Sequence, residues 1–504
     1  MLTFYLNIYR NSIIGSALTW LTAFIMRLWH GSLFRRLFFG DWNIGFERTI
    51  EFKYLAKLAD GSAILGFVNR AENRLYDLFC PLYEGSFFLR LAGGFFGVKD
   101  IRDYRGILLV LLTVICIPIL PTMVTLALCC LSVGLFACRF LLGRTAFKFG
   151  TADFFIALLA VVIFISILIS YIPSVSARMG LVYILFILFY FVVRNLVDTR
   201  AKLFAVVSGI LVSGFVVSFL GILQEHIGLN FVMTEAWIDT DMFGEATTRV
   251  YSTLANPNML AAYLIFVMLL AFAGLYYFEN YFYKFVSLGI FATAALCMIY
   301  THSRGAWLGL ILAFGLYALF KDRRLIWLGV LALPFLPFFV PETIWERLLS
   351  VGNLEDTSTT YRLYIWLASL SMIQDFWPIG IGPGTRVFVF IYQKYAFSTI
   401  YAPHSHNLFL QLLIDYGISG LLLFSAAIFM FYRAYLSNLK HTKESFLTAA
   451  GAAICAGMGG YLLQGMTDHV WYNYRLVAFF WVMIAIAVAL GQVMKGDNNN
   501  VEKV

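Results

Sequence analysis

Long apolar runs separated by short polar breaks fill most of this chain from Ile107 onward. About 20 apolar residues are enough to cross a bilayer as a helix. The pattern predicts about twelve membrane spans, and the first two, joined only by the Pro118 to Pro121 turn, should form a helical hairpin. We therefore predict an all-α polytopic bundle with spans at residues 106–120, 121–140, 153–171, 180–197, 202–223, 258–277, 283–301, 305–320, 324–340, 417–436, 447–466 and 474–494.

The first 103 residues follow a different pattern, in which apolar and charged residues mix at helical spacing, as in residues 33–38. We interpret this region as amphipathic helices that lie on the cytoplasmic membrane surface. The alternative is that one of them crosses the bilayer. The chain is thus divided into a surface region (1–103), a transmembrane domain (104–494) and a cytoplasmic tail (495–504).

Composition agrees with a membrane protein, since 61% of the residues are hydrophobic and only 13% are charged. Soluble domains carry about 25% charged residues. The net charge of +8 therefore indicates no nucleic-acid partner. Lys and Arg gather in alternate loops, which predicts that these loops and both termini are cytoplasmic. Two long segments, 224–257 and 341–416, then lie on the outer face, and the second is large enough to hold helices.

Five of the seven histidines fall on this predicted outer face, and two of them form His404-Ser405-His406-Asn407 before the span at 417. Histidine exchanges protons near neutral pH, so His406 is a candidate general base. Two histidines at this spacing also suit a metal, but further ligands would have to come from His302 or from Asp468-His469. A single base is the simpler hypothesis, and we expect neither a metal nor a cofactor.

Two arginines are candidates for binding an anionic group. Arg304 lies in the very short turn Ser303-Arg304-Gly305, where an arginine is costly unless it is solvated or paired. The alternative is an interfacial anchor that snorkels to the headgroups. Arg362 follows a Thr/Ser-rich helix start, where a cation is unfavourable unless an anion binds there. A solvated surface arginine is the alternative.

Three further segments are candidates for substrate binding. Gly380-Ile381-Gly382-Pro383-Gly384-Thr385-Arg386 is a tight turn whose N–H groups suit a phosphate, although it lacks the ending of a P-loop. A structural turn is the alternative, so Gly382, Gly384 and Arg386 are provisional members of the site. Asn256 and Asn258 form a turn and cap at the start of a span. Asp468-His469 either belongs to the site or is part of an aromatic belt with Trp471 and Tyr472.

Over residues 150–490 these motifs together resemble the O-antigen ligase and polymerase family of membrane glycosyltransferases. The most specific element is His406-Asn407 followed by Gly417-x-x-Gly420, which is similar to the family's His-Asn…Gly-x-x-Gly signature. Ser303-Arg304-Gly305 and the helix start at Arg362 match its two outward arginines. The block from Tyr251 to Asn258 resembles a branch long labelled bicarbonate transporters. The first hundred residues have no counterpart in the simplest members.

This resemblance implies metal-independent transfer of a glycan from an undecaprenyl diphosphate carrier to an acceptor hydroxyl on a glycan, lipid or protein. Arg304 and Arg362 would hold the diphosphate, and His406 would accept the hydroxyl proton. Ligase and polymerase share this core. The rival function is bicarbonate or anion transport, although few ionisable residues lie within the predicted spans. A non-catalytic envelope scaffold is a third possibility.

Overall fold

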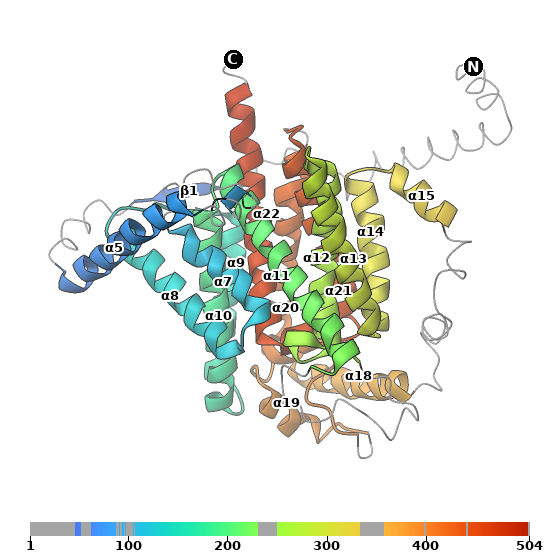
Figure 1. Ribbon diagram of the computed structural model, residues 1–504. Coiled ribbons are helices and arrows are strands. Elements are labelled where there is room, and N and C mark those ends of the chain that lie inside the picture. The colour runs from blue at the N-terminus through green and yellow to red at the C-terminus, as the bar shows by residue number, and fades with distance from the viewer. Residues whose placement is uncertain are drawn as a thin grey trace.

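The computed structural model describes residues 46–51, 62–86, 106–229, 249–332, 357–397, 400–439 and 442–501, with a few positions between 86 and 106. Nearly all of this is helix, which confirms an all-α membrane architecture in outline (Figure 1). The exception is an antiparallel ribbon of two four-residue strands, β1 (Glu47–Ile50) and β2 (Phe147–Gly150). The pairing joins segments a hundred residues apart, which local periodicity does not predict.

In the described part of the chain, nine helices are long and apolar enough to cross a membrane. They are α8 (Thr122–Leu141), α9 (Thr151–Leu168), α10 (Pro173–Leu196), α11 (Arg200–Ile227), α12 (Pro257–Tyr277), α13 (Tyr281–Tyr300), α20 (Leu408–Leu436), α21 (Ser445–Gly465) and α22 (Tyr474–Val501). Two shorter apolar helices, α7 (Ile107–Ile119) and α14 (Arg304–Phe320), occupy two further predicted spans. The predicted span 324–340 begins as α15 (Arg324–Ala332), and its remainder lies outside the described residues.

The bundle is organised around α12, α21 and α22, whose apolar windows are 83%, 78% and 89% buried, whereas α8 and α13 remain largely exposed at the periphery. Small residues permit close contact between helices α14 and α21. A Cβ on Gly309 of α14 would lie 2.6 Å from the carbonyl oxygen of Gly460 on α21. Packing through small residues is typical of membrane helices, because lipid supplies no hydrophobic force between them.

Helix α20 begins nine residues before the predicted span at 417, and it is broken at Gly417, which has φ 65° and ψ −167°. Backbone groups in and before the turn that precedes α19 (Thr385–Tyr392) form hydrogen bonds with the backbone groups that the break leaves unpaired within α20. The N–H groups of Ile381 and Gly382 donate to the carbonyls of Ile414 and Asp415, and Ile418 N–H donates to Trp377 O. The outer segment is thereby joined to the bundle by main-chain hydrogen bonds.

The remaining elements lie at opposite ends of the bundle. Helices α18 (Thr357–Phe376) and α19 are at one end, and the β ribbon and the C-terminal part of α22 are at the other (Figure 1). Near the ribbon end lies α5 (Ala63–Gly85), a helix of mixed apolar and charged residues as expected for that region. The other predicted N-terminal helices fall mainly outside the described residues. Two 3₁₀ turns, η2 (Ser252–Leu254) and η5 (Val470–Tyr472), belong to the α18 end.

Candidate functional site

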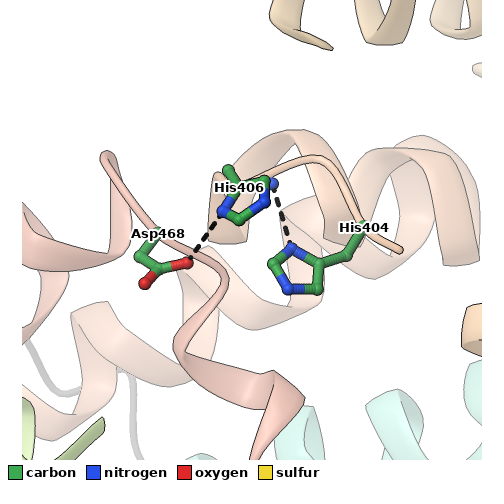
Figure 2. A group of neighbouring side chains, drawn as sticks. All are labelled: His404, His406 and Asp468. Carbon is green, nitrogen blue, oxygen red and sulfur yellow. Dashed lines mark hydrogen bonds and ion pairs between the residues drawn. The ribbon is translucent and has the colours of Figure 1, made fainter. Parts of the chain in front are cut away.

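His406 and Asp468 form the centre of a polar cluster at the α18 end of the bundle. The His406 Nδ1 atom lies 3.3 Å from Asp468 Oδ1, although 62 residues separate them in the sequence (Figure 2). His406 lies two residues before the start of α20, and Asp468 follows α21. Asn407, rather than His406, is the N-cap of α20, because its side chain accepts from the N–H groups of Phe409 and Leu410.

The backbone of His406 is strained, with φ at 50°. A non-glycine residue in this region costs about 1–3 kcal/mol and is retained only where the surroundings enforce it. Several bonds fix the residue here. Its N–H donates to His404 Nδ1 at 3.2 Å, and its carbonyl accepts from Trp366 Nε1 at 3.4 Å. The ring is therefore held in a defined position, with 22% of the side chain exposed.

Asp468 is a buried acceptor for several donors besides His406. Its Oδ2 accepts from Asn258 Nδ2 at 2.7 Å, and its Oδ1 accepts from the His469 N–H at 2.8 Å. Burial raises the pKa of Asp468, but the hydrogen bond and charge of His406 and the Arg362 guanidinium outweigh it and lower the pKa far below its usual value. An ionised carboxylate can only accept, so the proton of a neutral His406 resides on Nδ1 and the lone pair on Nε2.

The two neighbouring histidines, His404 and His469, are more deeply buried than His406. The rings of His404 and His406 are 4.2 Å apart between centroids, and His404 also contacts His469 and Tyr472. Burial, with the charges of His406 and His469, holds the pKa of His404 well below its usual value. Burial likewise lowers the pKa of His469 to about 3. Both rings are thus neutral at physiological pH, and His404 Nδ1 accepts the His406 N–H.

The predicted arginines approach this cluster from two other elements. Arg362 lies on α18 and is close enough for its charge to lower the pKa values of both Asp468 and His404. Arg304 is the first residue of α14, with Ser303 as N-cap. A Cβ on the adjacent Gly305 would lie 2.4 Å from Thr467 Oγ1, so this turn contacts the residue directly before Asp468.

Arg249 was not among the predicted site residues, yet it extends the cluster. Its Nη2 donates to Asn258 Oδ1 at 2.8 Å, and its Nε donates to Thr301 O at 3.0 Å. Asn258 connects it to Asp468. The available sequence signal was its position two residues before the block that begins at Tyr251.

Other predicted residues have structural contacts. Asn256 caps α12 as expected, accepting from Asn258 N–H and Met259 N–H. The turn at Gly382 and Gly384 packs on α9 and α10, since Cβ atoms there would meet Ser170 and Val175. Gly382 N–H is already engaged by α20. Arg386 is exposed near the start of α19. A substrate-binding role for these residues stays a prediction.

His404, His406 and Asp468 are also geometrically able to hold a cation, because one potential ligand atom from each lies within 4.8 Å of the others. A zinc ion requires ligand distances of about 2.0–2.2 Å. Binding would therefore draw the three groups closer together than they are in this structure.

Comparison with known proteins supports the resemblance suggested by the motifs. Residues 289–425 match the family model described as O-antigen ligase. This segment includes Arg304, Arg362 and the signature from His406 to Gly420. Among curated proteins, none matches the chain. Over these residues the chain is similar to the O-antigen ligase family, whose members transfer glycans in polysaccharide assembly.

Proposed function

We propose that this protein transfers a glycan from an undecaprenyl-diphosphate-type carrier to an acceptor hydroxyl at the outer face of the cytoplasmic membrane. The termini and the ribbon end would lie in the cytoplasm, as the distribution of basic loops predicts. The observation that carries the proposal is the His406–Asp468 pair, with the charge of Arg362 beside it, at the end of the membrane helices.

In this reaction the acceptor oxygen attacks the anomeric carbon of the glycan, and the bond from that carbon to the diphosphate oxygen breaks. His406 Nε2 takes the hydroxyl proton, while Asp468 holds Nδ1–H and stabilises the resulting imidazolium. The leaving lipid diphosphate gains negative charge, which Arg362 and Arg304 neutralise. No step requires a metal ion. The lipid chain of the carrier remains between helices, so the site has to be at a membrane boundary.

Asn258, Asn407, His404 and His469 have supporting positions in this scheme. Asn258 and Asn407 fix the loops on either side of the pair, because Asn407 Nδ2 donates to Met466 O and Asn258 Nδ2 donates to Asp468. The neutral ring of His404 supports the strained backbone of His406. Gly305 lets the Arg304 turn approach Thr467 closely, and Ser303 is the N-cap of the helix that Arg304 begins.

The test is a transfer assay with the purified full-length protein in liposomes, supplied with a lipid-diphosphate glycan and an acceptor. His406→Asn suits the test because asparagine tolerates positive φ, and we expect it to reduce release of lipid diphosphate by about 10²–10⁴-fold. Arg362→Gln should reduce the rate similarly. His226→Gln, at an exposed histidine on the same side, and Lys394→Gln, at an exposed lysine after α19, are the matched controls.

Undiminished release by both site variants would refute the roles proposed for His406 and Arg362, and anion flux without release by the wild type would refute the enzyme hypothesis and favour a transporter. A chelator separates the two chemistries available to the His404–His406–Asp468 group. Transfer that persists in the chelator supports the metal-free reaction, whereas transfer abolished by it and restored by a divalent cation contradicts metal independence.

A further inference from the structure

A cavity of about 230 Å³ lies at the ribbon end of the bundle, opposite the candidate site. It is lined by the start of α9 and by the C-terminal parts of α10, α20 and α22. Three cationic side chains line it, Arg194, Arg433 and Lys495, together with the two carboxylates Glu47 and Asp153. None of these residues takes part in the proposed transfer reaction.

Arg194 is the central feature of this cavity, because its side chain is only 1% exposed and incompletely paired. Its Nε lies 3.1 Å from Asp153 Oδ2, and its Nη2 lies 3.3 Å from Glu47 Oε1. Its Nη1 has no hydrogen-bond partner among the residues that the structure describes. A buried guanidinium N–H without an acceptor costs about 1–3 kcal/mol or more, so an acceptor in the cavity would stabilise the fold.

The two carboxylates are already occupied by protein donors. Asp153 accepts from Tyr190 Oη at 2.6 Å and from Gly150 N–H at 2.7 Å, in addition to Arg194. Glu47 Oε1 accepts from Gln492 Nε2 at 2.8 Å. The charge of Asp153 is therefore committed to groups within the wall, whereas the Glu47 side chain is 46% exposed and Lys495 is exposed near the end of α22.

The N-terminus of α9 provides a second feature suited to an anion. Thr151 and Ala152, the first two residues of this 18-residue helix, line the cavity. The first N–H groups of a helix lack intrahelical acceptors and carry partial positive charge. Arg194 Nη1, these N–H groups and Lys495 together form the donor set expected for a phosphate.

We infer that this cavity binds a phosphate-bearing anion, with the phosphate between Arg194 and the first turn of α9. The volume suits a headgroup-sized ligand rather than a nucleotide. Apolar residues lie at the same place: Phe46 lines the cavity and is 44% exposed, next to the exposed ring of Phe154. An anionic phospholipid and free inorganic phosphate share the required chemistry, and basic pockets between membrane helices bind lipid headgroups.

The experiment uses the full-length protein purified in detergent. Thermal unfolding is measured with sodium phosphate against sodium chloride at equal ionic strength, and with phosphatidylglycerol against phosphatidylcholine. Native mass spectrometry measures the affinity for phosphatidylglycerol. We expect phosphatidylglycerol to raise the unfolding temperature of the wild type. A rise with inorganic phosphate as well identifies the phosphate itself as the ligand, and a rise with the lipid alone identifies the lipid headgroup.

Two variants assign any binding to this cavity. The double variant Arg194→Gln/Asp153→Asn removes both charges of the buried pair, so that neither is left alone, and it should weaken binding at least tenfold. Lys495→Gln, at an exposed position, should weaken it severalfold and keeps the test valid if the double variant does not fold. Arg144→Gln, at an exposed arginine after α8, and Lys394→Gln, at an exposed lysine at the other end, should bind as the wild type does. Equal affinity in all variants, or no stabilisation of the wild type, would overturn the inference.

Discussion

Replacing Asp468 by asparagine is the sharpest perturbation of the candidate site, because it preserves shape and removes charge. The carboxylate accepts from three donors: the His406 ring, the Asn258 amide and the His469 N–H. In Asp468→Asn, an NH₂ group must face at least one of these donors. A buried donor without an acceptor costs about 1–3 kcal/mol.

With the NH₂ group in the place of Oδ1, His406 can relieve its own part of this conflict in a way that is harmful to catalysis, while the His469 N–H still faces the NH₂ group. The His406 ring can move the proton to Nε2, so that Nδ1 accepts from the new amide. The lone pair that should receive the acceptor proton is then lost from Nε2. Loss of a general base reduces the rate by about 10²–10⁴-fold. We therefore expect the rate of lipid-diphosphate release to fall by this factor, while the apparent affinity for the donor changes little.

Initial rates in liposomes at saturating donor measure this effect, with protein quantity checked by gel filtration. Asp375→Asn is the matched control, since Asp375 is an acid on α18 at the same end whose Oδ2 accepts from Tyr395 Oη. If Asp468→Asn releases lipid diphosphate within threefold of the wild-type rate, Asp468 does not fix the tautomer of His406 and the reasoning is wrong.

Three further outcomes are expected. Gly309→Ala should lower the unfolding temperature, because the new Cβ lies 2.6 Å from Gly460 O and overpacking costs about 1–3 kcal/mol, whereas Gly315→Ala on the same helix has no neighbour within 4 Å and should not. Burial lowers the pKa of His469 in the folded protein to about 3, so between pH 6.5 and 5 its ring binds a proton in the unfolded chain but not in the folded protein. The free energy of unfolding should therefore fall by about 2 kcal/mol over this range. Thermal melts of His469→Gln should show a smaller loss. Arg249→Lys keeps the charge but not both hydrogen bonds and should slow transfer about tenfold, a prediction that an unchanged rate would contradict.

Hydrophobic pattern predicted the spanning helices well, because apolar length alone decides whether a segment can cross a bilayer. It failed where polar or tertiary contacts set the boundary. Helix α20 starts at Leu408 because Asn407 caps it, although Gly417 looked like the start of the span. Helix α10 starts at Pro173, a residue well suited to a first turn, and not at residue 180.

The sequence indicated individual candidate residues of the site, but not the contacts between them. Chemical type and spacing made His406, Arg304 and Arg362 candidates, but nothing in the local sequence shows that Asp468 faces His406 across 62 residues. Arg249 was overlooked for the same reason, since its partners Asn258 and Thr301 lie on other elements. Partnerships of this kind depend on how loops from several helices meet, which a single sequence does not contain.

The main-chain joint between the turn at residues 380–382 and the broken helix at Gly417 limits how such proteins can be recombined. Every bond in it runs between peptide groups, and glycine is needed on both sides: a Cβ on Gly380 would lie 2.6 Å from Asp415 O, and one on Gly417 would lie 2.6 Å from Pro378 O. A chimera that exchanged the outer segment alone would combine two backbones whose peptide groups are not positioned to form these hydrogen bonds. Exchanging the outer segment would therefore require residues 377–382 and 414–420 to be transplanted as one unit.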